Sequence, residues 1–195
     1  MRIRYIYILL SLLLIGCSDY TPTPKPRGYA RIERKDTIQE VKFEEQQFSF
    51  SYLSDATVSY VKSEGKNDVW FNISYHDYDA DIYCTYFPVS RKTLSGALED
   101  TYQLAYSHAV KADGIDQVFY SDSINHIYGV MYDIKGDVAS PVQFYVTDSV
   151  SNFLRGSLYF QDIVKQDSVS PVIDFIRGDI VRIMESLRWK NTHSG

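Results

Sequence analysis

One cysteine of this chain stands in a setting that is typical of lipid attachment. Two arginines lie at the start of the sequence, an apolar run covers residues 5–15, and the small residue Gly16 comes directly before Cys17. This is the pattern of a bacterial signal peptide that is cleaved just before a cysteine, whose thiol then carries acyl chains such as palmitate. We therefore expect residues 1–16 to be a lipoprotein signal peptide. Acylated Cys17 is then the lipidation site, which holds the protein on the lipid bilayer.

Two other interpretations of this stretch are a transmembrane anchor and an ordinary cleaved signal. The apolar run is only about 11 residues long, whereas a helix needs ~20 residues to cross a bilayer. An ordinary signal does not require a cysteine at its cleavage point. Lipidation of Cys17 explains the pattern better than either of these.

A second candidate for chemistry is the alternating acidic run Asp77, Asp79 and Asp81, which resembles the start of a calcium-binding loop. Such a loop has glycine at its sixth position and an acidic residue at its twelfth. Here these positions hold Ile82 and Pro88. We therefore interpret the three acids as a solvated loop and predict no metal site.

The four histidines, His76, His108, His126 and His193, do not have the spacing of metal ligands. The chain also lacks a Gly-x-Ser-x-Gly elbow, a phosphate-binding glycine loop and a His-Glu-x-x-His motif. We therefore predict no catalytic residue and no cofactor. An envelope hydrolase with an unrecognised site around His108 or the acids at 77–81 stays open as an alternative.

Composition limits the kinds of partner. The net charge of −5 argues against a nucleic-acid partner and against electrostatic attachment to anionic lipid. Cys84 is the only other cysteine, so we expect no intrachain disulfide. Seventeen tyrosines suit cross-strand pairs in a sheet, and they equally suit a surface that contacts a protein partner.

Apolar periodicity predicts the secondary structure that must position these groups. Period-two patterns predict strands at 48–52, 70–75, 82–87, 117–121, 127–134, 142–147 and 153–160. Helical spacing predicts one helix over 91–111 and a second that begins with Ser170 as N-cap and Pro171 at its first position, and ends near Trp189. This order indicates an α+β fold, an antiparallel sheet covered by helices.

The chain divides into four predicted parts. The signal peptide is followed by a tether in which three prolines favour extended polyproline II geometry. One folded α+β domain and a short tail complete the chain, because the length suits a single core. The four parts are 1–16, 17–28, 29–190 and 191–195.

Six blocks of sequence, taken in order, resemble the GldD family of gliding-motility lipoproteins of Bacteroidetes. They are Pro-Lys-Pro-Arg-Gly-Tyr-Ala-Arg-Ile at 24–32, Trp-Phe-Asn-Ile at 70–73, Lys-Ala-Asp at 111–113, Val-Thr-Asp-Ser at 146–149, Asn-Phe-Leu-Arg-Gly-Ser-Leu-Tyr-Phe at 152–160, and the closing helix 174–190. The blocks cover nearly the whole chain from the cleavage site onward. The order of elements also looks like the α/β/α sandwich of PsbP and Mog1.

The resemblance implies an accessory lipoprotein of the gliding apparatus and of the linked type IX protein secretion system. Its implied partners are other envelope proteins of that machinery, and it implies no enzymatic activity. The implied location is the cell envelope, facing the periplasm, with the inner or outer membrane undecided. A lipoprotein that binds a small ligand or a glycan between sheet and helix stays open as a further alternative.

Among surface segments we expect 152–156 to contact a partner. Arg155 lies there between apolar neighbours and needs a paired carboxylate, such as Asp148. Two explanations of such a pair stay open: a contact with a partner, and an internal ion pair that stabilises the sheet.

The implied host also O-glycosylates envelope proteins at Asp-Ser/Thr pairs followed by an apolar residue or threonine. Four residues match this pattern: Thr37, Ser123, Ser149 and Ser168. A bulky glycan requires an exposed loop. We expect Thr37, before the first strand, and Ser168, just before the last helix, to be the better candidates, whereas Ser149 lies in a family block and can instead serve the fold.

Overall fold

The computed structural model describes residues 38–63, 65, 67–107, 112–161 and 166–190 of the chain, with the side chains of 166–168 left out. The predicted signal peptide, the tether and Cys17 lie outside these ranges, so they stay predictions, as does the division into four parts. Among the helices within the described ranges, none has the length and hydropathy that crossing a bilayer requires.

The described elements follow one another as strands, a helix, more strands and a helix. In chain order they are β1 (Glu40–Glu44), β2 (Phe48–Leu53), β3 (Thr57–Val61), β4 (Val69–Tyr75), the 3-10 turn η1 (His76–Tyr78), β5 (Ala80–Pro88), α2 (Leu94–Ser107), β6 (Ala112–Asp122), β7 (Ile127–Gly136), β8 (Val142–Thr147), β9 (Asn152–Phe160), α3 (Gln166–Ser186) and β10 (Arg188–Trp189).

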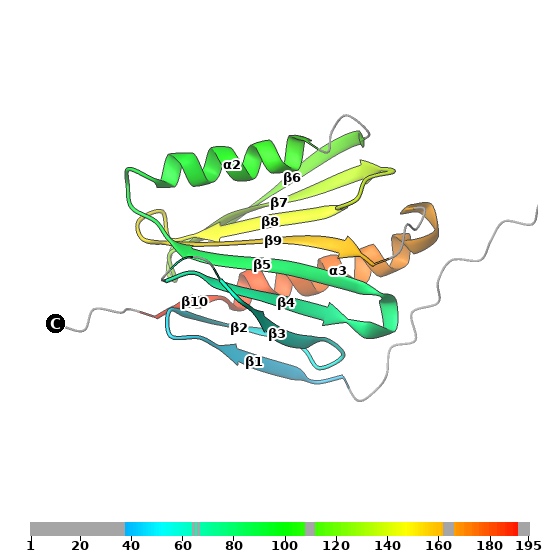
Figure 1. Cartoon of the computed structure of the whole chain (residues 1–195), viewed down its shortest axis with the longest axis horizontal. Helices are drawn as coiled ribbons and strands as arrows, with labels where there is room; N and C mark the ends of the chain where they lie inside the picture. The colour runs from blue at the N-terminus through cyan, green and yellow to red at the C-terminus, as the bar shows by residue number, and fades with distance from the viewer. Residues whose placement is uncertain (1–37, 64, 66, 108–111, 162–165, 191–195) are drawn as a thin grey trace, which may run out of the picture.

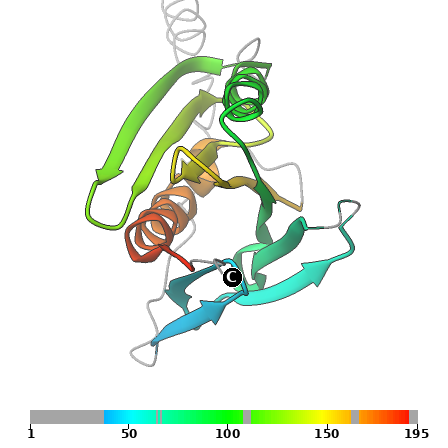
Figure 2. The same ribbon diagram turned by 90° about the vertical axis from the view of Figure 1, so that its left-hand side faces the viewer.

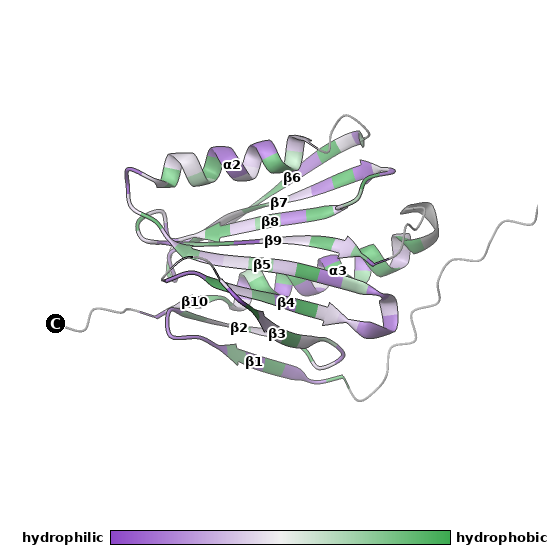
Figure 3. Cartoon of the chain, viewed as in Figure 1, coloured by the Kyte–Doolittle hydropathy of each residue, from purple (hydrophilic) through white to green (hydrophobic). Residues whose placement is uncertain are grey.

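Seven of these strands form one antiparallel sheet in the order β3-β4-β5-β9-β8-β7-β6 (Figure 1). Side chains alternate between the two faces of a strand, so Phe71 of β4, Cys84 of β5 and Gly156 of β9 lie in one row on the same face. Figure 3 shows this alternation as changes of hydropathy along the strands. The period-two pattern of the sequence therefore reflects a sheet with two different faces.

One face of this sheet is covered jointly by α3 and by a small antiparallel sheet with the order β1-β2-β10. The apolar stripe of α3 is buried in this core, as is the aromatic side of β2. The rings of Phe43 and Phe71 stack with their centroids 5.1 Å apart, and those of Phe48 and Tyr86 are also 5.1 Å apart. These ring contacts join the small sheet to the large one.

The opposite face is covered only in part. Helix α2 buries Ala97, Thr101 and Ala105, and it packs on Val130 and Tyr132 of β7. Figure 2 looks along the sheet and shows α2 on one side and α3 on the other. The predicted fold class, an antiparallel sheet covered by helices in an α/β/α arrangement, is confirmed.

The main error of the sequence analysis concerns the last helix. Ser170 is not its N-cap, because α3 already begins at Gln166 and Pro171 lies inside it. A proline there removes a single helical hydrogen bond close to the N-terminal end, which the helix tolerates. The helix also ends earlier than predicted, since Trp189 pairs with Phe48 as part of strand β10.

Two glycines give opposite predictions for stability. A Cβ at Gly178, on the exposed side of α3, would meet nothing within 4 Å, so Gly178→Ala should raise the free energy of unfolding by about 1 kcal/mol. A Cβ at Gly156 would overlap the ring of Phe144, so Gly156→Ala should lower it by about 1–3 kcal/mol. Denaturant unfolding of both variants measures this, and a stabilised Gly156→Ala would contradict the packing described above.

Candidate functional site

A cleft of about 580 Å³ opens at one end of the large sheet, where four separate segments meet. We call it the end cleft. The segments are the end of β5, the β6–β7 turn, the β8–β9 turn and the chain after α3, which lie at the left in Figure 1. The cleft is lined by Tyr86, Pro88, Val89, Asn125, His126, Asp148, Val150, Ser151, Asn152, Trp189 and Lys190.

Asp148 organises the β8–β9 turn on one side of this cleft. Its Oδ1 accepts hydrogen bonds from the N–H groups of Val150, Ser151 and Asn152 at 2.8, 2.8 and 2.9 Å. Its Oδ2 accepts from the hydroxyl of Ser151 and the amide of Asn152 at 2.8 and 2.7 Å. An aspartate whose oxygens bind the following backbone in this way fixes the turn.

Tyr86 and Trp189 form an aromatic wall of the cleft, with ring centroids 6.4 Å apart. The Tyr86 hydroxyl donates to Oδ1 of Asn152 at 2.8 Å, and Nε1 of Trp189 donates to the carbonyl of His126 at 3.2 Å. Burial, together with the charge of Asp148, raises the pKa of Tyr86 to about 12, so its hydroxyl stays protonated as a donor. The hydroxyl of Tyr86 and the indole N–H of Trp189 thus have hydrogen-bond partners within the protein.

A second hollow of about 440 Å³ adjoins the end cleft on the side of α2. We call it the Arg155 groove; it lies between the start of α2 and strands β5 and β9. It is lined by Phe87, Pro88, Val89, Thr93, Gly96, Ala97, Asp100 and Arg155. Pro88 and Val89 line both hollows, so the end cleft and the Arg155 groove meet at this pair of residues.

The predicted ion pair between Arg155 and Asp148 is wrong. In the described structure the guanidinium of Arg155 lies 5.8 Å from the centre of the Phe87 ring and makes no ion pair. The register places Arg155 opposite Thr85 and Tyr145 on the α2 side of the sheet, whereas Asp148 lies in the turn beyond the strand end. Both oxygens of the Asp148 carboxylate also accept hydrogen bonds from residues of its own turn. A partner contact at these residues stays a prediction.

The predicted glycosylation sites fall in different places. Ser123 is exposed in the β6–β7 turn, and Ser149 is exposed with a left-handed φ of 64°. Ser168 was expected just before the last helix, but it lies within α3 because that helix begins at Gln166. Thr37 lies outside the described residues. Glycosylation itself stays a prediction at all four.

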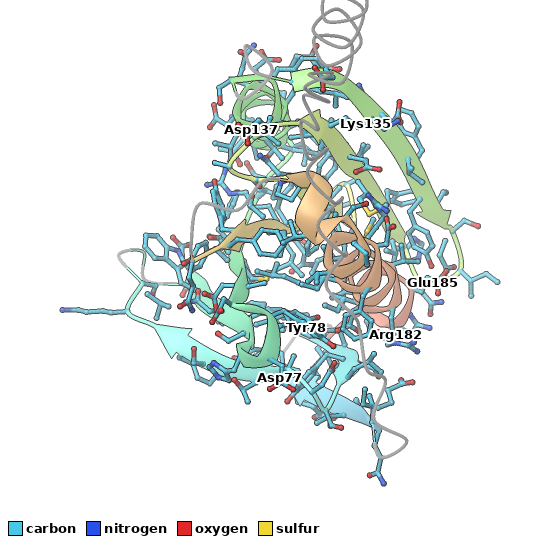
Figure 4. The ribbon with its side chains drawn as sticks, turned by 90° about the vertical axis from the view of Figure 1, so that its right-hand side faces the viewer. Asp77, Tyr78, Lys135, Asp137, Arg182 and Glu185 are labelled. Carbon is cyan, nitrogen blue, oxygen red and sulfur yellow. The ribbon has the colours of Figure 1, made fainter. Side chains whose placement is uncertain are left out.

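The acids at 77–81 lie at the opposite end of the molecule from the end cleft, because β5 begins beside them at Ala80 and ends at Pro88 in the cleft. Figure 4 looks onto the end where Asp77 lies. Asp77 belongs to η1, and Asp79 adopts a left-handed conformation that ends it. Asp81 is only 7% exposed and accepts a hydrogen bond from Gln161 at 3.1 Å, so the interpretation as a solvated residue is wrong for this one. Across the described ranges, no group of three or more His, Cys, Asp or Glu side chains could hold a metal ion.

Several residues of the end cleft were missed by the sequence analysis. His108 and His193 lie outside the described residues, but His126 is exposed at the cleft. Tyr86, Trp189 and Lys190 also line it, and none carried a local signal of a site. The one hint was indirect, because 146–149, 152–160 and 174–190 are blocks of the family resemblance and all three reach this end.

Asp148→Asn should reduce the acid sensitivity of stability. Burial raises the pKa of Asp148, but the N–H groups of Asn152, Ser151 and Val150 outweigh it, so the native pKa lies below the ordinary value. Such a group stabilises the fold above its unfolded pKa of about 3.9, and this contribution is lost as the pH falls through the native pKa. We expect the variant to be about 1–2 kcal/mol less stable at pH 7.

The measurement is the free energy of unfolding of both proteins between pH 7 and pH 2. The gap between wild type and Asp148→Asn should close as the pH falls. Parallel curves over the whole range would show that the charge of Asp148 does not support the turn.

Comparisons with known proteins identify the family of the chain. The search of curated proteins returned no match. The solution structure of cyanobacterial PsbP (CyanoP) from Synechocystis sp. PCC 6803 is similar with a TM-score of 0.45 and 10% sequence identity, over 85% of this chain and 99% of that chain. The family described as gliding motility lipoprotein GldD matches residues 19–189. Since that match spans most of the sequence, the chain belongs to the GldD family of gliding motility lipoproteins.

Proposed function

We propose that this lipoprotein is a membrane-anchored binding and assembly component of the gliding apparatus and the linked type IX secretion machinery, and that it docks other envelope proteins at the end cleft. Membership of the GldD family supports the link to gliding motility. The observation that carries the docking site is the position of the end cleft relative to the first described residues of the chain.

The described chain begins at one end of the molecule, and the end cleft lies at the other (Figure 1). Strand β1 starts at Glu40, which pairs with Leu53, and it runs to Glu44. The carboxylate of Glu44 is 3.2 Å from Nζ of Lys190, a residue that lines the cleft. A tether from lipidated Cys17 would therefore join the body at the far end, and the cleft would face the periplasm.

The chemistry of the cleft favours binding over catalysis. The hydroxyl of Ser151 donates to the carboxylate of Asp148, so it is not arranged as a nucleophile beside an imidazole base. Val150 at the rim is 51% exposed, which suits contact with a protein. A ligand-binding lipoprotein is the second candidate, because the Arg155 groove lies between a helix and the sheet.

Cys17→Ser should release the protein from the membrane or leave it unprocessed, because the lipid and not the polypeptide holds it there. Fractionation of cells that produce the variant measures this, with the wild type in the membrane fraction as reference. Tight membrane association of a cleaved Cys17→Ser protein would contradict the prediction that a lipid on Cys17 holds the protein on the membrane.

Val150→Glu should reduce spreading and secretion of cargo proteins while leaving the melting temperature unchanged. A charge at the rim opposes docking of an apolar partner surface, and an exposed side chain contributes little to folding. Val118 on edge strand β6 is equally exposed at 51%, lies outside the end cleft and gives the matched control Val118→Glu. The assays are colony spreading and secretion in a strain that carries only the variant gene.

Deletion of the gene should abolish spreading, and the deletion strain is the fully defective reference for this experiment. Normal spreading of the deletion strain would reject the function as a whole. Normal spreading of the Val150→Glu strain at wild-type protein level would reject the end cleft as the docking site. Loss of spreading with Val118→Glu alone would instead indicate that the docking site lies on β6.

A further inference from the structure

We propose that the Arg155 groove binds the carboxylate of an acidic side chain in an extended peptide segment of the docked partner. This inference rests on the proposed function, since it assigns a chemistry to the surface that continues the end cleft. The groove volume of about 440 Å³ is within the range of ligand sites.

The Arg155 guanidinium is half-buried and carries five N–H donors. In the described structure these donors make no hydrogen bond or ion pair, and the guanidinium lies 5.8 Å from the centre of the Phe87 ring. Its donors are therefore available to an anion that enters the groove.

The backbone of Arg155 has a central position in the large sheet. Arg155 lies in β9, between Thr85 of β5 and Tyr145 of β8, in the middle of the seven-stranded sheet. The central strand fixes the position of the Arg155 backbone, and the ring of Phe87 lies beside the guanidinium. Carboxylates bind such a planar group through two parallel hydrogen bonds, with geometric specificity that lysine does not provide.

The wall of the groove that α2 forms leaves room for a peptide. Gly96 and Ala97 of α2 form part of this wall, and a Cβ at Gly96 would meet nothing within 4 Å. The turn that leads into α2 is closed by reciprocal hydrogen bonds between Ser90 and Thr93. Arg155 is the cationic group among the residues that line the groove.

The Arg155 groove and the end cleft share Pro88 and Val89 as lining residues. A segment that occupies both hollows must pass across these two residues. We assign the carboxylate on Arg155 to a side chain of this segment, and the test below distinguishes it from a carboxylate at a chain end. The predicted partner segment is extended, with an acidic side chain on Arg155 and apolar neighbours that reach toward Trp189.

Asp100 supplies an internal control. It lines the same groove, is exposed and makes no ion pair with Arg155 in the described structure. Its charge would repel an incoming carboxylate. Asp100→Asn should therefore strengthen binding of an acidic peptide, whereas Arg155→Gln should weaken it.

The test is an NMR titration of the full-length, nitrogen-15-labelled chain in detergent micelles. The probes are acetyl-Phe-Glu-Phe-amide, its glutamine analogue acetyl-Phe-Gln-Phe-amide, and acetyl-Phe-Gln-Phe with a free carboxyl end. We expect the glutamate peptide to shift the amide signals of Gly96 and Arg155, and to bind about tenfold more tightly than the glutamine peptide. Arg155→Gln should abolish this preference, Arg155→Lys should keep part of it, and Asp100→Asn should enlarge it.

Three results would overturn the inference. They are equal binding of the glutamate and glutamine amides by the wild type, a preference that persists in Arg155→Gln, and tighter binding of the peptide with the free carboxyl end. The comparison within the wild type needs no variant, so it holds even if Arg155→Gln fails to fold. The Val150→Glu spreading assay tests the docking function separately, so the two can fail independently.

Discussion

Asp179 carries a carboxylate into the interior between α3 and the large sheet, where the residue is only 1% exposed. Burial raises its pKa, so the ionised group costs stability at neutral pH unless the surroundings offset it. The hydroxyl of Tyr75 in β4 donates a hydrogen bond to it, and Nε of Arg182 lies 3.6 Å from its other oxygen. Arg182 lies on α3 itself, so a shift of the helix along its axis would break only the contact with Tyr75. That loss would deprive a buried carboxylate of a donor, so the hydrogen bond between Tyr75 and Asp179 fixes how the helix lies on the sheet.

The position of α3 in turn determines the end cleft. The helix ends at Ser186, whose hydroxyl accepts a hydrogen bond from the N–H of Ser51 at 2.9 Å, and strand β10 follows directly. Trp189 then packs against Phe48 and Tyr86, with ring centres 6.5 and 6.4 Å away. The aromatic wall of the end cleft thus depends on a helix that is anchored by Asp179 far from the cleft itself.

The two hollows use their charged residues in opposite ways. Asp148 directs both oxygens into its own turn, so the end cleft has a rigid shape and its carboxylate is occupied. Arg155 keeps its donors unused beside the ring of Phe87. A surface that combines a preorganised aromatic cleft with one available cation is suited to recognising a partner, because rigid groups lose little entropy on binding.

Local patterns in the sequence were sufficient to predict where the long strands lie. Strand β8, for example, spans the predicted residues 142–147, and both of its faces are buried or half-buried. The short strands β1, β3 and β10 were missed, since they are largely exposed and depend on hydrogen bonds to neighbours distant in sequence. The predicted lipidation motif at Cys17 is likewise a local pattern, since it is defined by neighbouring residues along the chain. The contacts of Arg155 could not be predicted from local patterns, because strand register decides which side chains meet across a sheet. The carboxylate of Asp148, which is near in sequence, is bound by the backbone of its own turn. The end cleft is assembled from four segments that only the packing of α3 and the sheet brings together.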